Sequence, residues 1–228
     1  DYLSEKQFVD PARMRLLRGG VLQIAPPSDQ PRPRFGDDKA NADICFAASK
    51  YSPGGLDKGY DLFVEAAHQV HAARRDVRFH VIGDFDPADQ DLRKVRDVTT
   101  FHGHLPRARL HEVFRAMDVI VAPSRPFVLQ PGAFDGFPLG SCVEAAACGV
   151  AMIATDELNE NQDFVPNHDL VLVAPDAGEI AARLIELLER PDDLDALRRH
   201  GEAAVRRIYS FERQVEPRIS MLSEYLAK

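Results

Sequence analysis

The sequence contains no long apolar run. No stretch approaches the eighteen or more apolar residues that a membrane-spanning helix needs. The start of the chain also lacks the charged, apolar and small-residue regions of a signal peptide. These two absences, together with the cysteine usage described below, lead us to expect a cytoplasmic protein.

Basic residues are outnumbered by acidic ones. The chain holds 28 Lys and Arg residues against 36 Asp and Glu residues, which gives a formal net charge of −8 at pH 7. An excess of negative charge disfavours nucleic acid or an anionic membrane as a partner. It still leaves room for a local basic pocket.

Cysteine is rare as well. Cys45, Cys142 and Cys148 are the only three, an odd number, and each lies in an apolar segment. This usage favours buried, reduced thiols over a disulfide framework.

Common nucleotide and hydrolase signatures are missing too. No G-x-G-x-x-G follows a strand pattern, and no serine lies in a G-x-S-x-G context. Gly54 and Gly59 have the spacing of a P-loop, but Tyr60 and Asp61 stand where Lys and Ser or Thr are required. The sequence therefore excludes these three kinds of site.

Histidine pairs give no metal site. His68 and His71 are one helical turn apart, and His102 and His104 alternate. No nearby cysteine or acid completes a tetrahedral set around either pair. We therefore expect surface or hydrogen-bonded histidines and no bound metal.

Short apolar segments alternate with helical patterns through most of the chain. Apolar strands with short connections to helices indicate a parallel sheet that is covered on both faces. We therefore predict a doubly wound, Rossmann-like α/β domain over residues 42–210. The expected strands are 44–48, 77–83, 98–101, 119–123, 150–154 and 170–173, and the expected helices are 60–75, 89–95, 107–117, 139–148, 177–189 and 194–208.

Both ends of the chain differ from this pattern. The proline-rich centre of residues 1–41 cannot form a helix or a central strand, so a linker or wrapping arm is expected there. Residues 211–228 carry one apolar stripe, interrupted by Pro217, that could pack on its own domain or on a missing partner. The stripe comprises Phe211, Val215, Ile219, Leu222 and Leu226.

Residues 134–146 are the most informative segment. Pro138 suits the first position of a helix, and Phe137 before it offers no side-chain acceptor as an N-cap. The backbone N–H groups of Leu139 and Gly140 would then be open to a ligand. Such a helix terminus could hold an anionic, hydroxyl-rich ligand such as a sugar nucleotide.

Two lysines flank a glycine-rich turn. Lys50 precedes residues 53–59, and Lys58 lies within them at the head of the expected helix. Lysine suits phosphate as a point-charge donor, so the pair could neutralise a departing diphosphate. The alternative is that both are solvated loop residues.

Six motifs in this order resemble the donor-binding half of a GT-B glycosyltransferase of the large family four group. The resemblance covers residues 42–210 and implies that fold, with a trailing helix at its end. The motifs occupy residues 58–62, 81–84, 101–105, 118–124, 135–138 together with 144–145, and 149–155.

The resemblance implies roles for individual residues. Lys58 would bind the donor diphosphate, and Lys50 would be a second cation. Asp135 would be the first acid of a paired motif, touching the transferred sugar, and Glu144 the second, holding the ribose hydroxyls. Further donor-binding residues would be Gly136, Phe137, Pro138, Leu139 and Ser124, with His102 and Leu105 beside the base.

The resemblance also implies a metal-independent, retaining hexosyltransferase without a cofactor. Its acceptor site would come from a missing N-terminal domain, of which residues 1–41 would be the tail and linker. This chain alone would bind donor and transfer nothing, and any contact with a membrane would come through the missing part.

Two departures from the family pattern keep alternatives open. The first acid is Asp rather than Glu, it lies nine rather than eight positions before Glu144, and residues 125–134 form a longer lead-in. One alternative is a non-catalytic module that keeps the fold for binding or scaffolding. The other is a sugar-nucleotide epimerase of the same fold.

Overall fold

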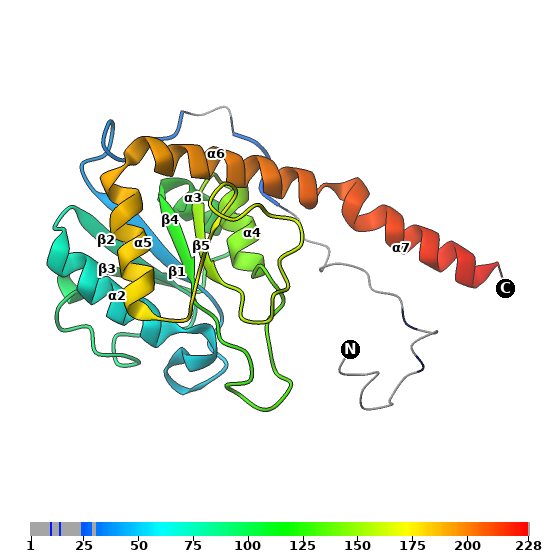
Figure 1. The fold of residues 1–228 in the computed structure, drawn as a ribbon, viewed down its shortest axis with the longest axis horizontal. Helices are drawn as coiled ribbons and strands as arrows, with labels where there is room; N and C mark the ends of the chain where they lie inside the picture. The colour runs from blue at the N-terminus through cyan, green and yellow to red at the C-terminus, as the bar shows by residue number, and fades with distance from the viewer. Residues whose placement is uncertain (1–9, 11–13, 15–23, 29–30, 228) are drawn as a thin grey trace.

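A six-stranded, all-parallel sheet forms the centre of the protein (Figure 1). The computed structural model describes residues 10, 14, 24–28 and 31–227. The strand order is β3-β2-β1-β4-β5-β6, so the order reverses between β1 and β4. The strands are β1 (Ala42–Ala47), β2 (Val77–Ile82), β3 (Thr99–Gly103), β4 (Val119–Ala122), β5 (Ala151–Thr155) and β6 (Val171–Val173). The predicted doubly wound sheet is confirmed.

Helices cover both faces of the sheet because the strands are apolar on both. Ile44 and Phe46 of β1 enter one buried cluster, and the alternate residues Cys45 and Ala47 enter the other. Helices α2 (Tyr60–Ala73) and α5 (Ala177–Glu189) pack over the first cluster. Helices α3 (Arg107–Ala116) and α4 (Gly140–Ala147), with the end of α6 (Pro191–Ile208), pack over the second. Short 3₁₀ helices, η2 (Pro53–Lys58) and η3 (Arg96–Val98), occupy two connections.

The helix predicted at residues 89–95 is wrong. The segment forms turns because its aspartates accept hydrogen bonds from nearby backbone N–H groups. Asp89 accepts from the N–H of Asp86 at 2.9 Å, and Asp91 accepts from the N–H of Arg93 at 3.1 Å. Such local bonds compete with the helical ladder.

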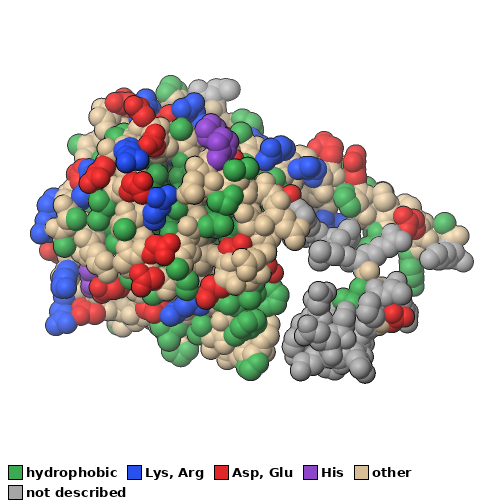
Figure 2. Space-filling model, in the orientation of Figure 1, with side chains coloured by type: hydrophobic (Ala, Val, Ile, Leu, Met, Phe, Trp, Pro, Cys, Tyr) green, Lys and Arg blue, Asp and Glu red, His purple; other side chains and the backbone are tan. Residues whose placement is uncertain are grey.

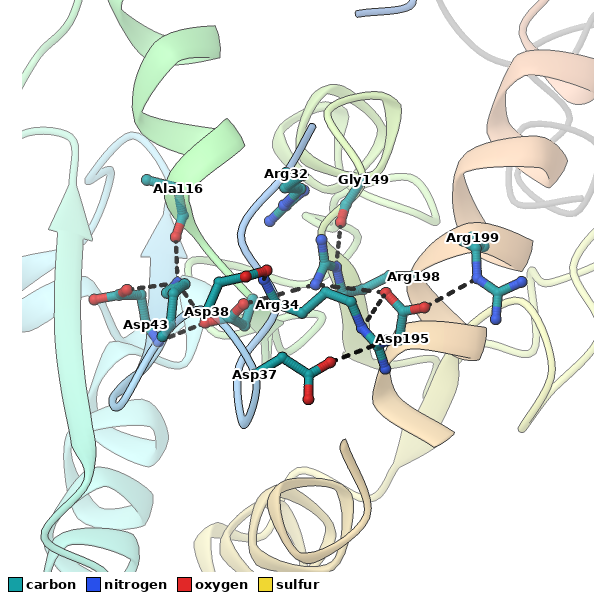
Figure 3. A network of polar contacts seen from close by, with 12 residues as sticks. Arg32, Arg34, Asp37, Asp38, Asp43, Ala116, Gly149, Asp195, Arg198 and Arg199 are labelled. Carbon is teal, nitrogen blue, oxygen red and sulfur yellow. Dashed lines mark hydrogen bonds and ion pairs between the residues drawn. The ribbon is translucent and has the colours of Figure 1, made fainter. Parts of the chain in front are cut away.

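The segment 31–41 lies across the amino ends of β1 and β4 (Figure 3). Lys39 Nζ contacts Asp43 Oδ2 at 2.6 Å, Asp118 Oδ2 at 2.7 Å and the Ala116 carbonyl at 2.7 Å. Phe35 of the same segment is buried in the first cluster. These residues therefore pack on the domain. The assignment of residues 1–41 to a linker or arm stays a prediction and falls partly outside the described residues.

Asp118 and two arginines extend this network inside the protein. Asp118 is completely buried, and its Oδ1 lies 3.8 Å from Arg198 Nη1. Arg32 donates to the carbonyl of Cys148, and Arg198 donates to the carbonyl of Gly149 at 2.9 Å. Burial, with Arg198 nearby, lowers the pKa of Arg32 to about 9. Asp118, Arg32 and Arg198 are thus held in place by opposite charges as well as by hydrogen bonds.

The last helix, α7 (Phe211–Leu226), extends away from the body of the domain in Figure 1. Phe211, Ile219, Leu222 and Leu226 of its apolar stripe are exposed. Packing of this stripe on its own domain is therefore wrong, because α7 leaves the sheet instead of crossing it. None of the helices in the described part of the chain has both the length and the apolar character that crossing a bilayer requires. The three cysteines are buried and free, as predicted.

Candidate functional site

Loops at the carboxyl ends of β1 and β4 meet above the switch point of the sheet. Gly59, between η2 and α2, makes this approach possible. Its φ is +69°, and a Cβ there would lie 1.9 Å from the carbonyl oxygen of Pro123. Only glycine combines this backbone conformation with such a close contact. The loop that carries Lys58 is thereby seated directly against the end of β4.

Lys58 and Asp135 form a close ion pair in this region. Lys58 Nζ lies 2.7 and 2.6 Å from the two oxygens of Asp135, and 3.4 Å from Asp57 Oδ2. The Lys58 side chain is 6% exposed, and its Nζ lies 4.6 Å from the centre of the Tyr51 ring. The structure thus brings together Lys58, which is predicted to bind the diphosphate, and Asp135, which is predicted to bind the sugar, although they are 77 residues apart in sequence.

Lys50 makes a separate ion pair. Its Nζ lies 3.0 and 2.8 Å from the two oxygens of Asp89, and this hydrogen bond raises the pKa of the Lys50 ammonium. Phe85 lies below it, with the ring centre 6.0 Å from Nζ. Lys50 is therefore neither a simple solvated residue nor in contact with the Lys58–Asp135 pair.

The loop before α4 lines a small cavity. The predicted residues Ser124, Asp135, Gly136, Phe137 and Leu139 take part in its wall. The facing wall comes from the loop after β5 and is strongly acidic, with Asp156, Glu157 and Glu160. A hydrogen bond of 2.6 Å from Thr155 Oγ1 to the Ser124 carbonyl ties the two walls together.

Residues 126–134 form an apolar lobe next to this cavity. The lobe contains no charged residue, and its exposed side chains are Phe127, Val128, Leu129 and Phe134. The Phe127 and Phe134 rings contact each other edge to face with centres 6.4 Å apart. Figure 2 shows hydrophobic side chains gathered along the lower edge of the molecule, where the loops at this end of the sheet lie.

Helix α4 starts one residue after the predicted range 139–148 begins and two residues after Pro138. The helix begins at Gly140 with Leu139 as N-cap, so Pro138 is not its first residue. The reason is that Leu139 has an extended ψ of 146°, which ends the loop after the cis Phe137–Pro138 bond. No side chain among the described residues caps this terminus, as expected from the sequence.

Glu144 lies on α4 and faces α3. Its Oε1 is 3.6 Å from Arg107 Nη2, and its Oε2 is 3.5 Å from His111 Nε2. The sequence analysis missed both partners. The available signal was their spacing of four residues on one helix, which places them on the same helical face.

His102 packs against another histidine. Its Nε2 lies 3.0 Å from His80 Nδ1, and His80 Nε2 lies 3.0 Å from Asp43 Oδ1. Burial, followed by the charge of His80, lowers the pKa of His102. Leu105 packs on the second hydrophobic cluster. His102 and Leu105, which are predicted to lie beside the nucleotide base, are thus packed against the domain at the end of β3.

Metal ligands do not gather anywhere in residues 24–28 and 31–227 or at residues 10 and 14. No group of three or more His, Cys, Asp or Glu side chains there could hold a metal ion.

Comparison with known proteins gives the same family at two levels. A model of the family described as "Glycosyl transferases group 1" matches residues 42–190. The GDP-mannose-dependent monoacylated alpha-(1-6)-phosphatidylinositol monomannoside mannosyltransferase of Corynebacterium glutamicum is 31% identical over 159 residues, which are 68% of this chain and 41% of that protein. The D-inositol 3-phosphate glycosyltransferase of Gordonia bronchialis is 27% identical over 234 residues, 95% of this chain and 47% of that protein. The chain therefore spans less than half the length of these curated relatives.

Solved structures share the fold. The C-terminal domain of a glycosyl transferase group 1 family protein (LpcC) from Francisella tularensis superposes with a TM-score of 0.62 at 23% identity, over 81% of this chain and 95% of that one. Anabaena HepE in complex with UDP superposes with a TM-score of 0.65 at 17% identity, over 81% of this chain and 49% of that one.

Proposed function

Because this chain belongs to the glycosyl transferases group 1 family, we propose that it is the donor-binding half of a retaining glycosyltransferase that uses a nucleotide sugar. The Lys58–Asp135 pair supports this proposal, because a lysine ammonium, which suits phosphate, lies against a carboxylate, which suits sugar hydroxyls. The pair lies at the carboxyl end of a doubly wound sheet, where ligands of such folds bind.

In this proposal, residues of the site stabilise the diphosphate as it leaves the sugar. As the bond between sugar and diphosphate breaks, negative charge develops on the diphosphate and positive charge on the sugar. Lys58 and the uncapped start of α4 stabilise the former, and Lys50 joins them by exchanging its bond to Asp89 for one to phosphate. Asp135 then holds a hydroxyl of the transferred sugar, and Glu144 holds the ribose. No metal is needed for these roles.

The relatives suggest where to begin. The C. glutamicum relative is GDP-mannose-dependent, and HepE has been crystallised with UDP, so GDP and UDP are the first nucleotides to test. Both curated relatives are named for inositol-containing acceptors, which are the first acceptors to test with the full-length protein. The isolated chain is expected to bind donor without transferring sugar.

Calorimetric titration with GDP, UDP, ADP and their sugar conjugates tests the proposal. One nucleotide should bind with 1:1 stoichiometry, and Glu144→Ala should weaken it by about 1.5–3 kcal/mol, the size of a hydrogen bond to a charged group. Glu112→Ala is the control, because Glu112 lies on the exposed side of α3 paired with Arg109. Absence of binding in the full-length protein as well would support a non-catalytic module instead.

Asp135→Asn should separate diphosphate binding from sugar binding. The substitution removes the carboxylate that competes for Lys58, so the nucleoside diphosphate should bind about two- to fivefold more tightly, the scale of a partly exposed ion pair. The extra affinity for the sugar conjugate over the diphosphate should shrink. Titration of both ligands measures the two effects, and Asp91→Asn, at an exposed ion pair with Arg93, controls for net charge. Weaker diphosphate binding in Asp135→Asn would contradict the assignment.

A further inference from the structure

His111 is a buried histidine with no explained purpose in the fold. It is 9% exposed, and among the described residues its Nε2 has no hydrogen-bond partner. A buried polar atom without a hydrogen-bond partner costs free energy, so an unpaired His111 Nε2 calls for a functional explanation. Glu144 Oε2 lies 3.5 Å from this nitrogen.

The distance of 3.5 Å between His111 Nε2 and Glu144 Oε2 is slightly longer than a hydrogen bond. An N–H···O bond to a carboxylate is about 2.7–2.9 Å long, so a rotation of the Glu144 side chain is enough to close the gap. Glu144 has three side-chain torsions and is 20% exposed, which leaves it room to turn. His111 is enclosed in the packing of α3 and does not need to move.

Arg107 is the second donor beside Glu144, and its side chain is the more exposed of the two. Its side chain is 41% exposed, against 11% for His111, and its Nη2 lies 3.6 Å from Glu144 Oε1. An imidazole has fewer side-chain torsions than an arginine, so it holds a fixed position at a lower entropic cost. His111 is therefore the better orienting group of the two.

We propose that His111 is a positioning residue that orients the Glu144 carboxylate for the two ribose hydroxyls of the donor. This inference rests on the proposed function, in which Glu144 binds the ribose. A carboxylate accepts two hydroxyl bonds well only in one orientation, and a fixed neighbour that selects this orientation reduces the cost of binding. His111 itself does not touch the nucleotide.

Ribose selectivity provides the readout. The probes are GDP and 2′-deoxy-GDP, or the uridine pair if UDP is the nucleotide that binds. Wild-type protein should prefer the ribonucleotide by about tenfold, the size of one hydrogen bond to a charged group. His111→Leu has a similar volume but no N–H donor, and it should reduce this preference to about twofold, with a smaller loss of affinity for the deoxynucleotide, which keeps only one of the two hydroxyls. His111→Gln returns an N–H donor near the position of Nε2 and should restore the preference.

The variants separate the possible failures. Thermal melting first establishes that each variant is folded; if His111→Leu is not, the same comparison is made with His111→Asn, whose shorter amide cannot reach the position of Nε2. An unchanged ribose preference in a folded variant that lacks the His111 N–H group would overturn the role of His111. Equal losses for both nucleotides would overturn it too, because they indicate general damage to the site. Failure of the proposed function is distinct: Glu144→Ala itself would then leave the ribose preference unchanged.

Discussion

Lys58→Met should weaken binding of the nucleoside diphosphate by about 10- to 100-fold, the factor expected for loss of one charge-assisted hydrogen bond to phosphate. Methionine keeps most of the unbranched stem, so the buried path of the side chain stays filled. The ammonium is what disappears, and with it the cation closest to Asp135. Calorimetric titration with the diphosphate measures the loss directly.

The neighbouring carboxylates sharpen this prediction. Without Lys58, Asp57 and Asp135 remain as negative charges facing the same space, and a diphosphate approaching them is repelled as well as unassisted. Lys94→Met, at an exposed position, changes net charge equally and should leave the affinity at the wild-type value. A Lys58→Met protein that is folded and binds the diphosphate normally would remove Lys58 from the site.

Asp118→Ala should have the largest effect on stability, about 3–5 kcal/mol of the free energy of unfolding, as expected when one partner of a buried ion pair is removed. Asp118 accepts hydrogen bonds from Lys39 Nζ at 2.7 Å and from the N–H of Asp43 at 2.8 Å. It also offsets the charge of Arg198, whose pKa burial lowers. Alanine leaves these donors and cations in the interior without their common acceptor.

Urea denaturation with two further variants tests this explanation. Asp118→Asn keeps an oxygen that can accept from the Asp43 N–H. Its stability should therefore lie between that of the wild-type protein and that of Asp118→Ala. Asp192→Asn is the matched control, because its carboxylate is 98% exposed although it also pairs with an arginine, Arg34. Its denaturation midpoint should equal that of the wild type. Equal midpoints for Asp118→Ala and Asp192→Asn would contradict the importance of the buried network.

The strands were predictable from sequence because burial on both faces leaves continuous apolar segments, as in residues 119–122. The failed helix at 89–95 lies where local chemistry decides: Asp89 and Asp91 bind the backbone beside them and stop the helix. The outward path of α7 could not be predicted, since a single apolar stripe does not say what will cover it.

Within the candidate site, residue types were easier to predict than partners. Lys58 and Asp135 were each chosen for their chemistry, but their ion pair depends on two loops meeting across the sheet. The bond between Lys50 and Asp89 depends on the turns that replaced the expected helix. The spacing of Arg107 and His111 puts them on one helical face but does not point to Glu144, because that relation exists only once α3 packs beside α4.

The arm formed by residues 31–41 extends the packed domain beyond the start of its recognisable motifs. The family pattern starts at residue 42, but Lys39 and Arg32 lie before it and neutralise or bind groups of the domain interior. A chain cut at residue 42 would keep every recognisable motif and lose the cations that those motifs fold around. The arm is anchored at the amino ends of β1 and β4, so a pull on it acts at the end of the sheet opposite the loops that carry Lys58 and Asp135.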